Sequence, residues 1–384
     1  MKNSPVTSST PPEGSTLSNR QLNRSFLARQ LLVERRHRSA ASVIEHLVGM
    51  QSQVPRDPFV GLWSRIDEFD HAELDQLMLD RKTVRMTLMR GTIHLVTNRD
   101  AYLLRPAMQA MIEKLLAGNA IVFPNLDGLD LDAVVASARA MLEREPMTGK
   151  HLGLRLGEAW PDRDPTALSY VPRYVLPLVQ VTPRGVWGKS QQPALTTIEA
   201  WLGEPMDRYH DPDDVIVRYL AAFGPATVTD IQVWSGLSGL REPVERLRPD
   251  LVTYRDERNR ELLDVPDAPF PDPETPVPVR FLPGFENALL SHADRTRIIT
   301  DEHRKRMWKV NGPVAPSFLV DGYVAGTWKL TKTKSEAVLD ITPFDAPLPP
   351  STRAELETEG RRLLAFLAPD AGRHDVIFRD SVDA

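Results

Sequence analysis

The sequence of 384 residues contains no cysteine at all. This absence excludes disulfides, thiolate nucleophiles and structural zinc sites that depend on thiolate ligands. It also fits the reducing environment of the cytoplasm, where we expect this protein to reside.

Long hydrophobic runs are missing too. No apolar stretch reaches the ~20 residues that a membrane-spanning helix needs, so we expect no membrane association. The first 18 residues are rich in Ser, Thr and Pro and lack the apolar segment of a secretory signal. We predict that residues 1–18 form a disordered tail. The remaining composition, 41% hydrophobic and 26% charged, is that of a globular protein with two to four domains.

Familiar catalytic signatures are also absent. The sequence has no glycine-rich phosphate loop, no His-Glu-x-x-His and no Gly-x-Ser-x-Gly. His292 and Asp294 stand two residues apart and could share a metal, but few other candidate ligands lie close by in the sequence. We therefore expect neither a metal site nor a cofactor.

Charge is unevenly distributed along the chain. The net charge of −5 argues against a nucleic-acid partner, but a local positive face is enough to hold phosphates. Arginines crowd 20–38 and 81–105, whereas acidic residues concentrate in 127–132 and 264–274. Charge alone leaves two interpretations open, a phosphate-binding face or a solvated arginine-rich surface.

One theme, helices followed by a short β pattern with a turn, recurs three times along the chain. The first instance has helices at 19–32, 41–51, 59–66 and 71–79 and a hairpin over 84–96. The second has helices at 131–145, 151–160 and 172–178 and a hairpin over 179–187. The third has helices at 213–223, 227–236 and 240–247 and strands at 251–254 and 261–264.

The third instance has the order of a winged helix, in which a β wing follows three helices. A Pro- and Asp-rich linker, 265–279, then leads to an expected antiparallel sheet beside one helix, with strands at 279–282, 316–320, 323–328 and 337–341 and the helix at 351–366. We predict an α+β, clamp-like fold of three tandem winged-helix units, 19–110, 111–208 and 209–265, followed by a β-rich region, 266–384. Winged helices bind DNA, but they also dock on other proteins.

Two glutamines, Gln51 and Gln53, stand one residue apart near the expected end of a helix, because Pro55 disfavours helix continuation. Side chains two residues apart on a regular helix face different directions, so the two amides converge only if the helix unwinds there. Such a pair can hold a water or a base edge, but it cannot perform strong acid–base chemistry. The alternative is a helix end whose side chains bond its own backbone.

Other polar candidates lie in less distinctive surroundings. His292, Asp294 and Arg295 fall in an expected loop after apolar residues, and this loop either supports a site or pins the C-terminal region to the rest. His94 alternates with apolar neighbours in an expected strand, which favours a partly buried, hydrogen-bonded histidine over a base or ligand.

Several segments together resemble the AlkZ-type family of bacterial DNA glycosylases. They are Gly49-Met50-Gln51-Ser52-Gln53, Leu88 to Val96, Gly185-Val186-Trp187-Gly188, Leu220 to Thr227, Ser291 to Arg295 and Val324 to Trp328. The resemblance extends from about Leu17 to Phe366. It implies tandem winged helices, a β-rich C-terminal part and an active cleft that contains the Gln-x-Gln pair. A sister branch carries Gln-x-Asp, so Gln53 resembles the branch that acts on bulky N7-alkylguanines and interstrand crosslinks.

The resemblance implies a monofunctional glycosylase of base excision repair, without lyase activity, that acts on alkylated purines in double-stranded DNA. Gln51 and Gln53 are then the catalytic pair, and His292, Asp294, Arg295 and His94 are candidates for support. We expect a monomer associated with the nucleoid. The alternative is a winged-helix regulator or lesion sensor without enzymatic activity. The residues expected to contact DNA are Arg56, Arg81, Lys82, Arg85, Arg90, Arg184 and Arg297.

Weak amides agree with the chemistry of such a substrate. An N7-alkylated purine is already cationic and leaves readily, so its removal needs a placed water and a stabilised sugar cation rather than a strong acid. Glycosylases usually rotate the base by ~180° into a tight pocket. A bulky or crosslinked base could not enter such a pocket, so we expect an open cleft.

Overall fold

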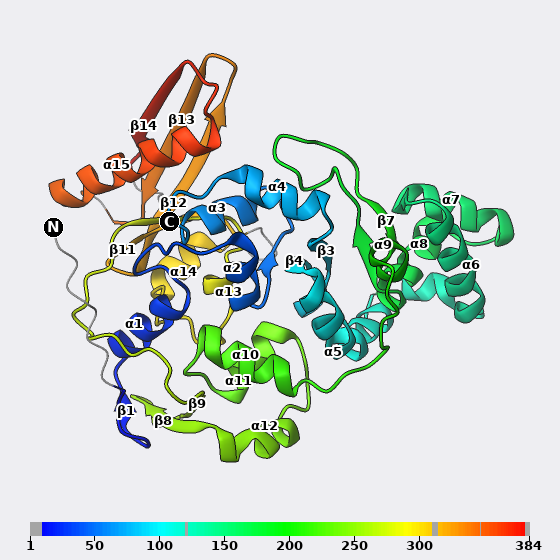
Figure 1. Ribbon diagram of the computed structural model, residues 1–384, viewed down its shortest axis with the longest axis horizontal. Helices are drawn as coiled ribbons and strands as arrows, with labels where there is room; N and C mark the ends of the chain where they lie inside the picture. Colours follow the sequence, from blue (N-terminus) through cyan, green and yellow to red (C-terminus); the bar gives the residue numbers. More distant parts are fainter. Residues whose placement is uncertain (1–9, 120–121, 309–313, 346, 381–384) are drawn as a thin grey trace.

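The structure is a computed structural model that describes residues 10–119, 122–308, 314–345 and 347–380. It is a mixed α+β fold in which helices surround three sheets of six, five and three strands (Figure 1). The predicted fold class is confirmed at this level. The short strand Met50–Gln51, at the start of the Gln-x-Gln pair, lies at one edge of the six-stranded sheet.

The first part of the chain forms one half of the six-stranded sheet, in the strand order β2-β4-β3. The predicted hairpin over 84–96 is confirmed as β3 and β4, with Gly91 in the turn. The expected helix over 41–51 is wrong, because α2 ends five residues earlier and a short strand follows it. The elements are α1 (Asn19–Arg29), α2 (Ala40–His46), β2 (Met50–Gln51), α3 (Asp57–Trp63), α4 (His71–Leu79), β3 (Thr83–Thr87) and β4 (Ile93–Thr97).

The second part repeats this order of elements and forms the other half of the same sheet, β6-β7-β5. The halves join where β3 and β6 pair antiparallel, with Arg85 opposite Gln180 and Met86 opposite Val179. The complete order β2-β4-β3-β6-β7-β5 therefore places equivalent strands symmetrically about the joint. The elements are α6 (Leu131–Arg144), β5 (Met147–Thr148), α7 (Gly149–Ala159), α8 (Pro165–Val175), β6 (Leu178–Gln180) and β7 (Ala194–Thr197).

Two expectations for this region are wrong. Helix α5 (Asn98–Ala117), the longest of the described helices, was not predicted; it crosses from one half of the sheet to the other. The predicted hairpin over 179–187 is instead a strand, β6, followed by a long loop before β7 (Figure 1). The loop reaches the first half, where the Trp187 ring lies 4.9 Å from Phe59 and 4.7 Å from His71, between ring centroids. Burial of this aromatic side chain explains why the segment leaves the sheet.

The third part has three helices and a small sheet. These are α10 (Asp213–Phe223), α11 (Val228–Ser235), α12 (Arg241–Leu247), β8 (Val252–Asp256) and β9 (Glu261–Asp264), after the short helix α9 (Ile198–Leu202). Ala226 forms an isolated antiparallel bridge with Leu263 of β9. Thr16 and Leu17 form β1 (Thr16–Leu17), which pairs parallel with β8. The expectation of a disordered tail is therefore wrong at its C-terminal end, and residues 1–9 lie outside the described residues.

The C-terminal part contains the five-stranded sheet, in the order β10-β11-β12-β13-β14. Its first four strands are antiparallel and α15 packs beside them, as predicted. The unpredicted β14 adds a parallel edge against β13. The elements are β10 (Arg280–Leu282), α13 (Asn287–Leu290), α14 (Asp301–Met307), β11 (Ser317–Val320), β12 (Tyr323–Lys332), β13 (Glu336–Pro343), α15 (Pro350–Leu367) and β14 (Arg373–Phe378).

Buried ion pairs connect these parts. Arg29 of α1 bonds Asp264 of β9 at 2.5 Å, and Arg65 after α3 bonds Glu286 before α13 at 2.8 Å. Removing one partner of a buried pair is costly, typically about 3–5 kcal/mol, because the other charge is left uncompensated. These contacts hold the third and C-terminal parts against the segment that carries Gln51.

Candidate functional site

The chain enters the Gln-x-Gln segment through a tight reversal at the end of α2. Val48 and Gly49 both have left-handed backbone angles, with φ of 55° and 88°. A Cβ at position 49 would lie 2.6 Å from Cγ1 of Val96, so only glycine fits there. This reversal ends the helix and lets Met50 and Gln51 pair with Leu95 and His94 of β4. The apolar spacing that suggested a longer helix reflects burial of both the helix and the strand.

The two amides lie at the end of a strand rather than on a helix. Strand β2 ends at Gln51, and Gln53 follows in a bend. Ser52 continues the pairing, because its amide donates to the carbonyl of Ile93 at 2.7 Å. The Ser52 hydroxyl and carbonyl accept from the guanidinium of Arg85 at 3.0 and 2.6 Å. The buried Ser52 thus anchors the segment between Gln51 and Gln53, which lie at a strand end rather than on an unwinding helix.

Gln51 is held from two directions. Its Oε1 accepts from Nη2 of Arg90 at 2.8 Å, and its backbone amide donates to Oδ1 of Asn287 at 3.2 Å. The Asn287 side chain also donates to the carbonyl of Gly49 at 2.7 Å. Asn287 of helix α13 therefore holds the strand that carries Gln51. The Gln51 side chain is buried.

Gln53 is exposed, and its side chain is held less firmly than that of Gln51. Its Oε1 accepts from the backbone amide of Ile93 at 3.3 Å. The side chain thus takes the position that a backbone carbonyl would occupy if β2 continued. This contact differs from the alternative of a helix end that bonds its own backbone, because the amide that donates to Gln53 belongs to β4.

Asp57, a residue that our sequence analysis passed over, lies in the same small cavity as Gln51. Glu286 and Asn287 also line this cavity. Asp57 begins α3, and its buried Oδ2 has no hydrogen-bond partner among the described residues. Burial raises the pKa of Asp57 to about 7, with Arg56 opposing the rise and Glu286 adding to it. The only signal in the sequence was an acid just before Pro58, which is equally typical of an ordinary helix start.

His94 lies directly opposite Gln51 in the sheet and is completely buried. Its Nδ1 lies 3.0 Å from the carbonyl of Thr92, and its Nε2 is buried without a partner among the described residues. Burial and the charge of Arg90 lower the pKa of His94 to about 3. His94 is therefore neutral at physiological pH and lies beside Gln51 on the neighbouring strand.

The loop from Ser291 to Arg297 does not reach the amide pair with its histidine or its carboxylate. His292 is buried, and its two ring nitrogens lie 2.9 Å from the Ser291 hydroxyl and 3.1 Å from the Phe223 carbonyl. Burial lowers its pKa to about 3, and the charge of Arg297 adds to this effect. These contacts are those of the alternative in which the loop pins two parts of the protein together.

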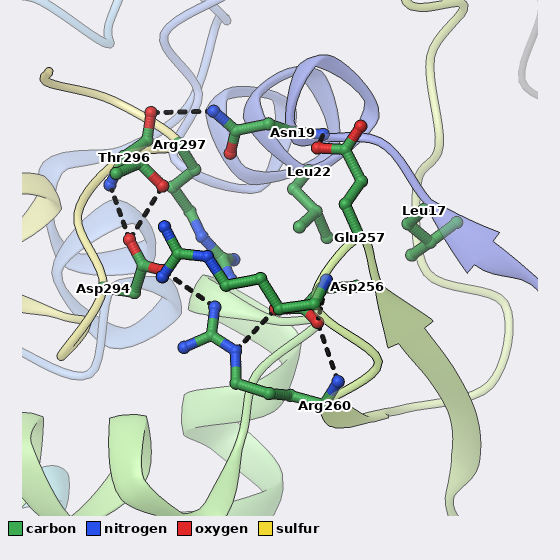
Figure 2. Close-up of a pocket in the computed structure, with 10 residues that line it drawn as sticks. Leu17, Asn19, Leu22, Asp256, Glu257, Arg260, Asp294, Thr296 and Arg297 are labelled. Atoms are coloured by element: carbon green, nitrogen blue, oxygen red, sulfur yellow. Dashed lines mark hydrogen bonds and ion pairs between the residues drawn. The ribbon is translucent and has the colours of Figure 1, made fainter.

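Asp294 makes a similar connection to the turn between β8 and β9. It bonds Arg258 at 2.9 Å and Arg260 at 2.8 Å, and it accepts from the Thr296 hydroxyl at 2.7 Å (Figure 2). Although burial opposes the shift, the hydrogen bonds from Thr296 and Arg260 lower the pKa of Asp294 to about 2. Asp294 therefore stays ionised across the physiological range and fixes the position of this turn.

Arg295, unlike His292 and Asp294, interacts electrostatically with Arg90, the partner of Gln51. Its charge contributes to the lowered pKa of Arg90, which burial holds at about 10. The Arg295 guanidinium lies 4.9 Å from the ring centroid of Trp308, and its Nε donates to the carbonyl of His292 at 3.3 Å. Arg90 therefore contacts Gln51 directly, and the charge of Arg295 acts on Arg90.

Two arginines expected to contact DNA are committed elsewhere. Arg85 is 3% exposed and bonds Ser52, and Arg297 is 5% exposed and donates to the carbonyl of Pro225 at 2.8 Å. Both fold the protein rather than present charge to a ligand, and this corrects their assignment as phosphate contacts. A basic residue in an arginine-rich stretch carries no sequence signal that separates burial from exposure.

The other predicted DNA contacts lie nearer to solvent. Arg56, Arg81 and Lys82 are exposed, and Arg184 and Arg90 are partly exposed. Arg81 donates to the carbonyl of Trp201 at 2.8 Å, with its guanidinium 4.0 Å from the centroid of that ring. None of the five forms an ion pair with a carboxylate among the described residues. Four of them remain available to bind an anion, whereas Arg90 donates to Gln51 and to the carbonyl of Trp234.

The described part of the chain contains no group of three or more His, Asp or Glu side chains that could hold a metal ion. Within the same residues, no helix is both long and apolar enough to cross a membrane.

Comparisons of the sequence and the fold with those of known proteins identify the family of this chain. Residues 44–366 match the family described as DNA glycosylase AlkZ-like. The chain is 24% identical over 339 residues to the interstrand DNA cross-link repair glycosylase of Streptomyces sahachiroi, covering 83% of this chain and 88% of that protein. The solved structure of the Streptomyces sahachiroi DNA glycosylase AlkZ has the same fold, with a TM-score of 0.75 at 21% identity over 95% of this chain and 100% of that one. The protein described above therefore belongs to the AlkZ-like DNA glycosylase family.

Proposed function

We propose that this protein is a monofunctional DNA glycosylase that hydrolyses the N-glycosidic bond of N7-alkylated purines in duplex DNA. The observation that carries the proposal is the geometry of Gln51 and Gln53. They are two uncharged amides, one at the end of β2 and one just beyond it, and neither is hydrogen-bonded to a carboxylate among the described residues. Family membership and the name of the Streptomyces relative, an interstrand DNA cross-link repair glycosylase, support the reaction class.

The chemistry of the site fits a leaving group that needs little help. An N7-alkylated purine departs as a neutral base, so the protein has no proton to deliver and needs only to orient water and substrate. A neutral purine would need an acid with a pKa near the working pH. His94, His292 and Asp294, with pKa values of about 3, 3 and 2, do not meet that requirement. Asp57 is the exception, because its pKa is about 7. The variant Asp57→Asn tests whether it contributes to catalysis.

Absence of lyase activity is part of the proposal. A lyase forms a covalent imine through an amine nucleophile, usually lysine. The described contacts of the amide pair come from arginine, asparagine and backbone groups. We therefore expect free base and an intact abasic strand as products. Because position 53 is Gln rather than Asp, we include bulky N7 adducts and interstrand crosslinks among the substrates.

We propose further that the protein binds DNA with three winged-helix units. The support is one recurrent order of helix, short strand, two helices and two strands, with the short strand beside the last strand of each group. In the first two groups the strand orders are β2-β4-β3 and β5-β7-β6. In the third, the bridge of Ala226 with Leu263 occupies the place of the short strand. Arg56, Arg81, Lys82 and Arg184 are the proposed DNA contacts, because they are exposed or partly exposed and lack carboxylate partners among the described residues. Arg90 is left out of this set, because its guanidinium donates to Gln51 and to the carbonyl of Trp234.

The test is release of free base from duplex DNA that contains N7-methylguanine, followed by release from a defined crosslink. Wild-type protein should release the methylated base, and Gln51→Ala and Gln53→Ala should each release it much more slowly. If the wild type releases nothing but still binds the duplex, the protein is a winged-helix DNA-binding protein without enzymatic activity. Cleavage of the abasic strand by the wild type would contradict the monofunctional mechanism.

A further inference from the structure

We infer that Arg90 is a positioning residue that locks the Gln51 amide, so that Gln51 acts on the substrate complex as a hydrogen-bond donor. The inference rests on the proposed function and deepens it, because it concerns the same site. It starts from the bond between Nη2 of Arg90 and Oε1 of Gln51, at 2.8 Å.

The chemistry of the two groups fixes the orientation of the amide. A guanidinium carries only donors, and an amide has one acceptor oxygen and one donor NH2 group. The reverse orientation would place donor against donor, so the oxygen must face Arg90. The NH2 group of Gln51 has no acceptor among the described residues, and it is not among the buried atoms left without a partner. It is therefore free to donate to a ligand.

Arg90 is itself held so that it can do little else. Its Nη1 donates to the carbonyl of Trp234 near the end of α11. Its backbone has a left-handed φ of 56°, and the turn that carries it packs on Gly236, where an added Cβ would lie 3.1 Å from Cα of Arg90. No carboxylate pairs with Arg90 among the described residues. Burial lowers the pKa of Arg90 to about 10, so the guanidinium still carries its charge at neutral pH. A charged donor makes roughly twice as strong a hydrogen bond as a neutral one, so the amide is firmly fixed.

The second amide has the same polarity. Oε1 of Gln53 accepts from the amide of Ile93 at 3.3 Å, which leaves its NH2 group facing away from the backbone. A water molecule has two lone pairs, and attack on the sugar requires one of them. If both glutamines donated to the same water, no lone pair would remain for the attack. Gln51 and Gln53 therefore perform different tasks, and at most one of them donates to the attacking water.

The first experiment is a double-mutant cycle that combines Arg90→Met with Gln51→Ala, measured as the single-turnover rate of N7-methylguanine release at saturating protein. If Arg90 acts through Gln51, Arg90→Met alone should lower the rate roughly 10- to 100-fold, as misplaced catalytic groups do. In the Gln51→Ala background it should change the rate less than about threefold. Arg90→Lys, which keeps a charged donor, should recover part of the rate. Equal losses in both backgrounds would overturn the inference.

Salt dependence separates this role from a phosphate contact. Each phosphate contact contributes about −0.9 to the slope of log affinity against log salt. Arg90→Met should leave that slope unchanged and lower the rate in the bound state. Arg81→Met serves as the matched substitution, because Arg81 is exposed and does not touch Gln51; it should weaken binding and make the slope shallower. A shallower slope for Arg90→Met with an unchanged bound-state rate would assign Arg90 to a phosphate instead.

Gln51→Glu tests the donor role directly. The carboxylate keeps the size of the amide and can pair with Arg90, but it offers no N–H to the substrate. We expect it to be about as inactive as Gln51→Ala. Activity close to the wild type would show that position 51 acts as an acceptor and would overturn the inference.

A readout without turnover keeps this inference separate from the proposed function. In protein labelled with 15N at glutamine side chains, the Gln51 NH2 signal is identified by its loss in Gln51→Ala. In Arg90→Met the signal should shift, and its hydrogens should exchange faster with solvent. If the wild type releases no base but this change occurs, the glycosylase proposal fails and the lock stands. An unchanged signal would refute the lock whatever the activity.

Discussion

The junction between the first short strand and the following helix is built differently in the two halves of the six-stranded sheet. In the second half, Thr148 ends β5 and its side chain caps α7 at once, accepting from the amide of His151. In the first half, Gln51 ends β2, five residues follow, and α3 begins without a side-chain cap. The third part of the chain resembles the second half, because Thr227 caps α11 within a reciprocal capping box.

The difference gives a physical reason for proposing a site at only one of these equivalent positions. A direct cap uses the polar groups of the junction to satisfy the helix start. In the first half, Arg90, Arg85 and Ile93 donate to side-chain oxygens of Gln51, Ser52 and Gln53 respectively, and Oδ2 of Asp57 is buried without a partner among the described residues. This uncapped junction therefore presents amide groups and a buried carboxyl, whereas the threonines at the capped junctions are engaged by the helix start.

The largest effect is expected for a substitution of Gln51, at the uncapped junction of the first half. Gln51→Ala should lower the single-turnover rate of base release by roughly 100- to 1,000-fold, the usual loss when one fixed donor is removed from a reacting centre. Its melting temperature should change little, because the backbone bond to Asn287 is retained. Base release with thermal unfolding as a control measures both. A variant that loses stability as much as activity would show that Gln51 is structural.

Asp57 should make stability depend on pH in an unusual direction. Its pKa in the folded protein, about 7, lies above its ordinary value of 3.8. The folded state then binds more protons than the unfolded state between about pH 4 and 7, so the contribution of Asp57 falls as pH rises through this range. At about 1.4 kcal/mol per pKa unit, Asp57→Asn should stabilise the protein by roughly 2–4 kcal/mol at pH 8 and by little at pH 4. Urea unfolding at the two pH values measures it, and equal differences would contradict the shift.

The pH dependence of base release tests whether Asp57 takes part in catalysis. With only amides at work, the bound-state rate should vary little between about pH 6 and 8. If the rate instead bends near pH 7 in the wild type and is flat in Asp57→Asn, Asp57 takes part in catalysis. A bend that persists in Asp57→Asn would point to a group outside the uncapped junction.

Gln53→Asp sharpens the contrast between an amide and a carboxylate at this junction. The shorter carboxylate can still accept from Ile93 but offers no NH2 group, so we expect a rate loss of roughly tenfold and a new dependence on pH. Rates measured from pH 5 to 9 test this. A rate and pH profile identical to those of the wild type would refute the proposed role of position 53.

The smallest expected effect lies at the capped junction. Thr148→Ala removes the cap of α7 and should lower the free energy of unfolding by about 1 kcal/mol, without changing the rate of base release in the bound state. Thermal unfolding and the glycosylase assay together measure it. A rate loss as large as that of Gln51→Ala would mean that the two junctions are functionally alike.

Local signals were sufficient for some elements and insufficient for others. The turn at Gly91 predicts the hairpin of β3 and β4, and the threonine before α11 predicts its start. The helix expected over 41–51 failed because apolar spacing reports burial, and α2 and β2 are both buried. The hairpin over 179–187 failed because Trp187 docks on α3 and α4, far away in the sequence. Such long-range packing overrides local preference.

The sequence by itself determined which groups are available to the site. They are two amides one residue apart, many arginines and no thiol, and these groups already exclude thiolate chemistry and favour a cationic leaving group. Only the tertiary structure decided what these groups do. It placed Gln51 at the end of an edge strand and Gln53 just beyond it, buried Arg85 and Arg297, and raised the pKa of Asp57. The physical reason is that hydrogen-bond partners and burial are set by residues distant in the sequence, such as Arg90 and Asn287.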